Sequence, residues 1–157
     1  MTISQQFEHE LKQLGTGGEA VLDVSAGDRH LTCNLVTRDS LAVAFQMLRL
    51  TTSELADAAA ADLERISAAL AGRLTYLMEP IHPIELDADA CVVQMRSNPP
   101  QQDDDGRSYF ELVVRRGGEL SLGRFHKQPG SPRQPVPANV TREVLLRLAA
   151  DFQAVLD

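Results

Sequence analysis

The residues best suited to chemistry lie close together in the segment EPIHPIELDAD, residues 79–89. This segment contains four carboxylates and one histidine, namely Glu79, His82, Glu85, Asp87 and Asp89. If residues 84–90 form a strand, Glu85, Asp87 and Asp89 project from one face at intervals of about 7 Å. Carboxylate oxygens are the ligands that Ca²⁺, Mg²⁺ and Mn²⁺ prefer in proteins. A small metal-dependent enzyme that uses the carboxylates of residues 85–89 is therefore one functional hypothesis.

The same alternation is also typical of an ordinary strand that is half exposed to solvent. Ligands spaced along one strand leave an ion open to water on most sides, so we expect these carboxylates to bind no divalent ion tightly. The run Asp103-Asp104-Asp105-Gly106 begins like a calcium loop, but Val114 stands where such a loop needs glutamate. No serine or cysteine has the local sequence of a nucleophile. We assign no catalytic residue, metal ligand or cofactor, and we favour a non-enzymatic protein.

The formal net charge of −7 is unevenly distributed along the chain. Residues 107–147 carry eight basic and three acidic side chains, so this segment has a charge of +5 and the remainder −12. A basic segment on an acidic protein indicates contact with an anionic partner or with a second copy. The candidate partner-binding residues are Arg115, Arg116, Arg124, His126 and Lys127. Nucleic acid is the weaker alternative, because only 4% of the residues are aromatic and can stack on bases.

The elements that must position these residues follow from the hydrophobic periodicity. Apolar residues three or four positions apart predict a first helix that carries Ile3, Phe7, Leu11 and Leu14 and ends at Gly15. Alternation then predicts a meander of three strands over residues 20–25, 30–36 and 41–50. In the third strand Leu41, Val43, Phe45 and Met47 are expected to point inward. A longer helix follows over residues 53–72, with Gly72 as its left-handed C-terminal cap.

After the second helix, the hydrophobic period changes again from helical to alternating. We expect an extended segment over residues 74–83, kept at a sheet edge by its two prolines, and then strands over 84–90 and 91–96. Two more strands carry Phe110, Leu112 and Val114 and then Leu120 and Leu122, with a bulge at Gly123 that turns Phe125 inward. Residues 97–107 and 128–139 are expected to be mobile loops. The last helix begins at Asn139 or Thr141.

This order predicts the fold class. With 43% apolar and 24% charged residues, the chain has the composition of a globular protein. We expect one α+β domain over residues 1–157: a mainly antiparallel sheet of five to seven strands with three helices, in the order α-βββ-α-β(β)ββ-α. The two cysteines, Cys33 and Cys91, stand at inward positions of strands and are expected to be buried free thiols. No apolar run reaches the roughly 20 residues of a membrane helix, and no secretory signal is visible, so we expect a cytoplasmic protein.

The second helix is rich in alanine, which allows another helix to approach closely. Its candidate dimer residues are Ala56, Ala60, Ala68 and Ala71. The order of elements, the mass of 17.2 kDa and the acidity resemble the small chaperones of type III secretion. Those chaperones dimerise through the helix between their two groups of strands and hold an unfolded segment of another protein. The resemblance therefore implies a chaperone-like, protein-binding homodimer that does not associate with membranes.

Overall fold

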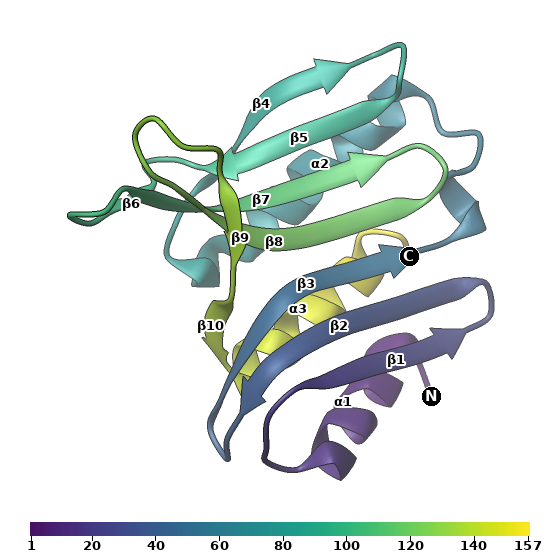
Figure 1. The fold of residues 1–157 in the computed structure, drawn as a ribbon. Helices are drawn as coiled ribbons and strands as arrows, with labels where there is room; N and C mark the ends of the chain where they lie inside the picture. The colour runs from purple at the N-terminus through teal and green to yellow at the C-terminus, as the bar shows by residue number, and fades with distance from the viewer.

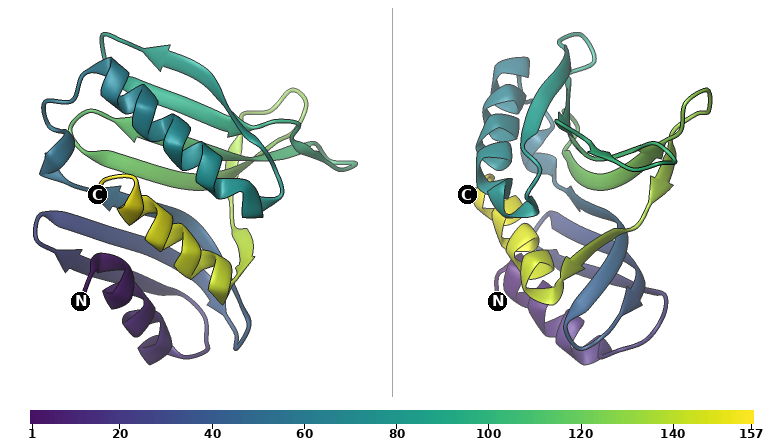
Figure 2. Two further views of the ribbon diagram at one scale, coloured as in Figure 1. Left: turned by 180° about the vertical axis from the view of Figure 1, so that it is seen from behind. Right: turned by 90° about the vertical axis from the view of Figure 1, so that its left-hand side faces the viewer.

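Three α-helices lie side by side on one face of a single antiparallel sheet in the computed structural model, which describes residues 1–157 (Figures 1 and 2). The chain forms α1 (Ile3–Leu14), β1 (Ala20–Ala26), β2 (Arg29–Arg38), β3 (Ala42–Thr51), the 3₁₀-helix η1 (Ser53–Leu55), α2 (Ala60–Arg73), the 3₁₀-helix η2 (Leu74–Leu77), β4 (Ile81–Asp87), β5 (Val92–Ser97), β6 (Gln101–Gln102), β7 (Arg107–Arg115), β8 (Glu119–Lys127), β9 (Gln134–Val136), β10 (Ala138–Thr141) and α3 (Arg142–Ala154). The predicted α+β class and element order are confirmed.

The main strand order is β1-β2-β3-β8-β7-β5-β4, so β1 and β4 are the two edges. These seven strands match the predicted number, and the short strands β6, β9 and β10 add to them. We call the sheet face without helices the open face. On the other face α3 lies between α1 and α2, and its inward residues Leu145, Leu148 and Phe152 are fully buried. The apolar stripe of α3 was predicted, and burying it places this helix at the centre of the core.

The inward residues of β3 differ from the prediction. Val43 and Phe45 are buried, but Leu41 is 72% exposed and the side chains that continue inward are Leu48 and Leu50. The β2–β3 register is irregular between the pairs Cys33↔Leu48 and Leu35↔Phe45. This bulge changes the face to which alternate residues point, so simple alternation fails beyond Phe45.

The second helix is shorter than predicted at its start. The backbone N–H of Gly117 donates to the Leu55 carbonyl (3.3 Å), so the β7–β8 turn holds η1 outside the helix. The backbone N–H of Ala59 donates instead to the Asp62 carboxylate (3.1 Å), and α2 begins at Ala60. Ala56 consequently lies in the turn between η1 and α2.

The end of α2 also differs from the prediction. Gly72 is not in the left-handed region, and the chain continues into η2 before Met78 adopts a φ of 65°. Leu74 and Leu77 are buried in η2 and extend the apolar stripe of α2. The Tyr76 hydroxyl donates to Asp151 of α3 (2.8 Å). Burial, together with this carboxylate, raises the pKa of Tyr76. These contacts explain why residues 74–77 are helical and not extended.

The predicted bulge at Gly123 is absent. The β7–β8 register runs without a break from Arg107↔Lys127 to Arg115↔Glu119. Phe125 therefore lies on the open face beside Tyr109, with ring centroids 6.2 Å apart. A side chain at Gly123 would begin 2.9 Å from the terminal methyl of Met47, so the glycine gives β3 room to pair with β8.

Both segments predicted as loops contain short strands. In residues 97–107, β6 pairs with the start of β7 and forms a hairpin extension. In residues 128–139, β9 pairs with β8 and leads into β10, which pairs with β3. The proline-rich segment thus crosses from one strand to the other, and it rises from the open face in the right panel of Figure 2.

The cysteine prediction is confirmed, since Cys33 and Cys91 are free and buried. Burial raises the pKa of the Cys33 thiol. No helix of the structure has both the length and the apolar character needed to cross a membrane.

Candidate functional site

An apolar groove lies between the end of α2 and the edge strand β4. It has a volume of about 600 Å³. One wall is formed by Ala68, Ala71 and Gly72 of α2, and the other by Ile81 and Pro83 of β4. The small residues of α2 leave the space open, because no side chain longer than a methyl group projects from them. Six of the eleven residues that line the groove are hydrophobic.

Large hydrophobic side chains are exposed beside this groove. Met78, which also lines it, is 87% exposed, and Leu86 of β4, which pairs with the inward Val93, is 39% exposed. The strand has only one neighbour, β5, so its outer edge presents backbone donors and acceptors to solvent. An apolar groove and an unpaired strand edge therefore adjoin each other.

Carboxylates lie near the groove and along the adjoining edge of β4. Glu64 lies one helical turn before Ala68 on exposed α2 surface. Glu79 lines the groove but is already bound by Arg124 (3.1 Å) and by the Ser97 hydroxyl (2.8 Å). Glu85 and Asp87 of β4 are exposed, and because they pair with Gln94 and Val92 they point to the open face. The groove lining and residues 84–87 of β4 therefore carry acidic and no basic side chains.

The structure brings only part of the predicted carboxylate cluster together. Glu85 and Asp87 lie on β4, Asp89 lies in the following turn, and Glu79 precedes the strand. No three histidine, cysteine, aspartate or glutamate side chains are arranged to hold a metal ion. That these carboxylates bind no divalent ion tightly stays a prediction.

The five candidate partner-binding residues do not form one surface. Arg115 and Arg116 lie at the β7–β8 turn, whereas the other three lie towards the far end of β8, about 17–27 Å away by strand rise. Arg124 points to the helix side, where its guanidinium lies 4.6 Å from the centre of the Phe110 ring. His126 contacts Ser108 (2.8 Å), and the Lys127 ammonium donates to the Gln128 carbonyl (3.1 Å). These residues form no continuous basic patch, and their role in binding a partner stays a prediction.

The predicted alanine surface is only partly on α2. Ala60 and Ala71 are half-buried, Ala68 is exposed, and Ala56 lies outside the helix. Since Ala68 and Ala71 line the groove, the surface predicted for self-association is also a groove wall. The dimer itself stays a prediction.

On the open face, basic and aromatic residues surround a buried carboxylate. Glu111 of β7 is 5% exposed and contacts Arg133 (2.8 Å), Arg96 (3.7 Å) and the Gln94 amide. Arg133 also lies 4.0 Å from the centre of the Phe125 ring, which fixes the proline-rich segment onto the sheet. The sequence analysis missed this cluster. The available signal was a glutamate inside an otherwise apolar strand, between Phe110 and Leu112.

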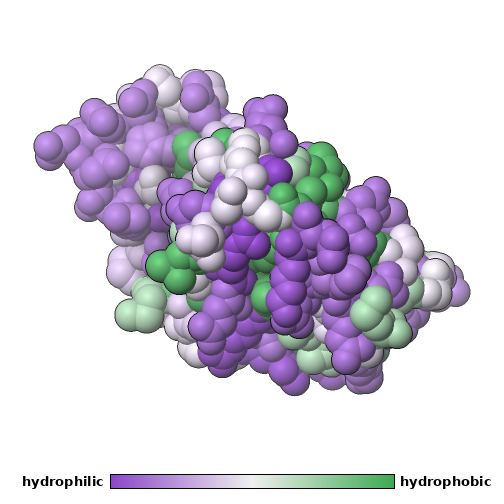
Figure 3. All heavy atoms as spheres, turned by 90° about the horizontal axis from the view of Figure 1, so that it is seen from below, coloured by the Kyte–Doolittle hydropathy of each residue, from purple (hydrophilic) through white to green (hydrophobic).

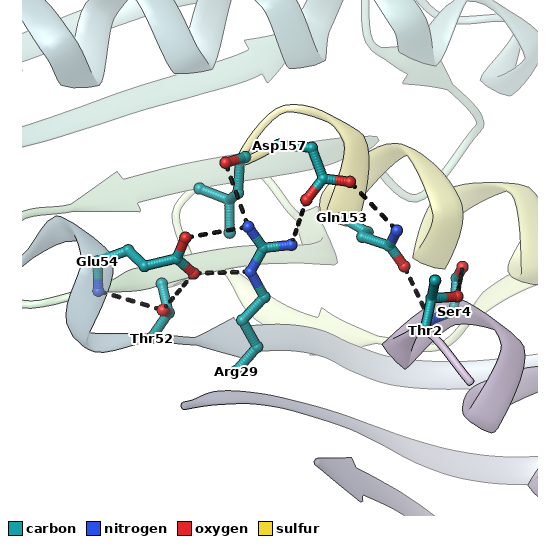
Figure 4. A network of polar contacts seen from close by, with 8 residues as sticks. Thr2, Ser4, Arg29, Thr52, Glu54, Gln153 and Asp157 are labelled. Carbon is teal, nitrogen blue, oxygen red and sulfur yellow. Dashed lines mark hydrogen bonds and ion pairs between the residues drawn. The ribbon is translucent and has the colours of Figure 1, made fainter. Parts of the chain in front are cut away.

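A second polar network lies where the start of α1 meets the end of α3 (Figure 4). Arg29 contacts Glu54 (2.6 Å) and Asp157 (2.6 Å), and Gln153 links Asp157 to the backbone of Ser4. Hydrogen bonds from Arg29 hold the pKa values of both Glu54 and Asp157 below their ordinary range. This network connects β2, η1, α1 and α3, so we interpret it as structural.

The network predicts a pH-dependent stability difference. Arg29→Ala should lower the free energy of unfolding by about 1 kcal/mol at pH 7, a modest loss because water screens the exposed carboxylates. Carboxylates with lowered pKa values stabilise the fold above their ordinary pKa, near pH 4, and lose this effect as the pH falls through the folded value. The difference between wild type and variant should therefore shrink in urea denaturation below about pH 4.

The matched control is Lys12→Ala, which removes an exposed pair with Glu8 and should change stability by less than about 0.5 kcal/mol. A loss for Arg29→Ala that stays constant from neutral to acidic pH would contradict the ionic contribution.

Comparisons with known proteins identify no relative: no protein-family model, curated protein or solved structure matches the chain.

Proposed function

We propose that this chain is a non-enzymatic, chaperone-like protein-binding module that holds an extended segment of a partner protein along β4. The observation that carries the proposal is the apolar groove next to an unpaired strand edge. An added strand would form main-chain hydrogen bonds with β4, while its alternate side chains would reach the groove. This mode of binding agrees with the activity that the resemblance to secretion chaperones implies.

The chemistry of the occupant follows from the two faces of β4. The apolar groove selects hydrophobic side chains on the helix side, whereas Glu85 and Asp87 favour basic side chains on the open face. In an extended segment every second side chain points to the same face. The best fit is a segment in which apolar residues alternate with lysine or arginine.

A second copy of this chain fits the same edge less well. Symmetric pairing of two β4 strands would place Glu85 and Asp87 near their own copies, and like charges that face each other across strands are destabilising. This repulsion favours a different protein over self-association.

The surface at the opposite end of the molecule lacks this combination. Seen from below, it is mainly hydrophilic, and its hydrophobic residues form several separate patches (Figure 3). Val21 on the edge strand β1 is exposed and lines a depression of about 450 Å³, but Glu19, Asn34 and Gln46 make part of its lining polar. We therefore place the binding surface at β4.

A synthetic peptide in which leucine alternates with lysine tests the proposal. We expect fluorescence anisotropy to show saturable binding to the wild-type protein. Ala68→Arg should weaken it about tenfold or more, because the new side chain fills the groove that the leucines would occupy. The matched control is Ala69→Arg, an exposed position on the same helix that borders a different depression and should leave binding unchanged.

Two results would overturn the proposal. One is equal binding of a peptide in which glutamate replaces every lysine, since Glu85 and Asp87 would then select nothing. The other is a wild-type dimer in light scattering that Ala60→Arg with Ala68→Arg converts to a folded monomer. That result would assign the α2 surface to a second copy.

A further inference from the structure

A small basic pocket opens on the open face at the corner formed by β4, β5 and β7. It has a volume of about 220 Å³, and its lining includes His82, Arg96, Arg107 and Tyr109. His82 pairs with Arg96 across β4 and β5. Arg107 and Tyr109 are two residues apart on β7 and so share one face. Three strands thus bring two arginines and a histidine to one cavity, and no acidic side chain lines it.

Arg96 has hydrogen-bonding capacity that the protein leaves unused. Its guanidinium lies 4.8 Å from the centre of the Tyr109 ring, which holds the side chain in place. The Nε atom is buried without a hydrogen-bond partner, since the nearest carboxylate oxygen, on Glu111, is 3.7 Å away. An arginine that is positioned but incompletely bonded is suited to an external anion.

The nearby Glu111 does not neutralise the pocket. Its carboxylate is held at 2.8 Å by Arg133 and by the Gln94 amide, so an arginine outside the pocket offsets its charge. Arg96 and Arg107 therefore keep an excess of two positive charges around the cavity. His82 is exposed and can offer a ring N–H as a further hydrogen-bond donor.

We propose that this pocket binds the phosphoryl dianion of a small molecule. A phosphate group offers three oxygen acceptors that point in different directions, and guanidinium forks from separate strands match that arrangement. The volume equals that of about seven water molecules, which accommodates a phosphate with a few attached carbon atoms. The site is distinct from the apolar groove, because Ile81 and Met95, which line the groove, point to the helix side.

Calorimetric titration of the intact protein with inorganic phosphate and with glycerol 3-phosphate tests the site. We expect a dissociation constant of about 1 mM or tighter for at least one of them. Arg107→Gln should weaken binding about tenfold, because it removes charge-assisted hydrogen bonds from an exposed residue that the fold does not use.

Arg115→Gln is the matched control, since it removes the same charge from the same face of β7. Arg115 lies about 27 Å along the strand from Arg107, well beyond the screening length of about 8 Å at physiological salt, so binding should be unchanged. Tighter binding of glycerol 3-phosphate would identify a phosphate monoester as the ligand, and tighter binding of inorganic phosphate would identify the free ion. Absence of saturable binding, or an equal effect of chloride at matched ionic strength, would overturn the proposal without affecting the peptide groove.

Discussion

Gly118→Ala is expected to destabilise the protein by more than about 3 kcal/mol, a loss reserved for substitutions that break a defined structural feature. Gly118 has a φ of 99°, and a Cβ atom there would lie 1.6 Å from the carbonyl oxygen of Thr52. Backbone cannot yield as a flexible side chain does, so the β7–β8 turn would have to move away. That movement breaks the hydrogen bond from the Thr52 N–H to the Gly118 carbonyl (2.8 Å), which holds η1 against the sheet.

The neighbouring glycine provides the control. Gly117 has a φ of 100°, but a Cβ atom there would meet nothing within 4 Å. Gly117→Ala should therefore cost only the backbone strain, about 1–2 kcal/mol. Urea denaturation followed by circular dichroism measures both variants. Equal losses for the two would show that the close approach to Thr52 is not what requires glycine at position 118.

Phe152→Ala should lower the free energy of unfolding by about 3–5 kcal/mol. Phe152 is fully buried, and α3, which carries it, lies between the other two helices on the sheet. Truncation removes a large apolar surface and leaves a cavity that the sheet and the two flanking helices cannot easily close. The result is measured as the shift of the urea midpoint at constant slope.

Phe152→Leu is the control for this substitution. It keeps most of the apolar volume and should cost less than about 1.5 kcal/mol. If Phe152→Ala cost no more than Phe152→Leu, α3 would not be packed as the central helix of the core.

Several elements were predictable from sequence because their signals are local. The stripe of Ile3, Phe7 and Leu11 repeats at the helical period, and all three residues are buried in α1. Phe110, Leu112 and Val114 alternate along β7 and are likewise buried. Short connections then required antiparallel neighbours, which gave the α+β class and the order of the elements.

Elements whose conformation depends on distant partners were not predictable. The start of α2 is set by the contact of Leu55 with Gly117, more than sixty residues later in the chain. The helical conformation of residues 74–77 depends on burial against the core and on the bond of Tyr76 with Asp151. Neither contact leaves a periodic signal near the residues that it controls.

The candidate sites show the same division. The sequence by itself determined which residues carry charge and which faces of the strands are apolar, because both follow from residue type and period. Only the tertiary structure decided which charges meet: it separated Arg115 from Lys127 along one hairpin and brought His82, Arg96 and Arg107 to one pocket. It also placed the alanines of α2 beside the open edge of β4. The physical reason is that strand order and register set distances across a sheet, and these depend on packing by the whole chain.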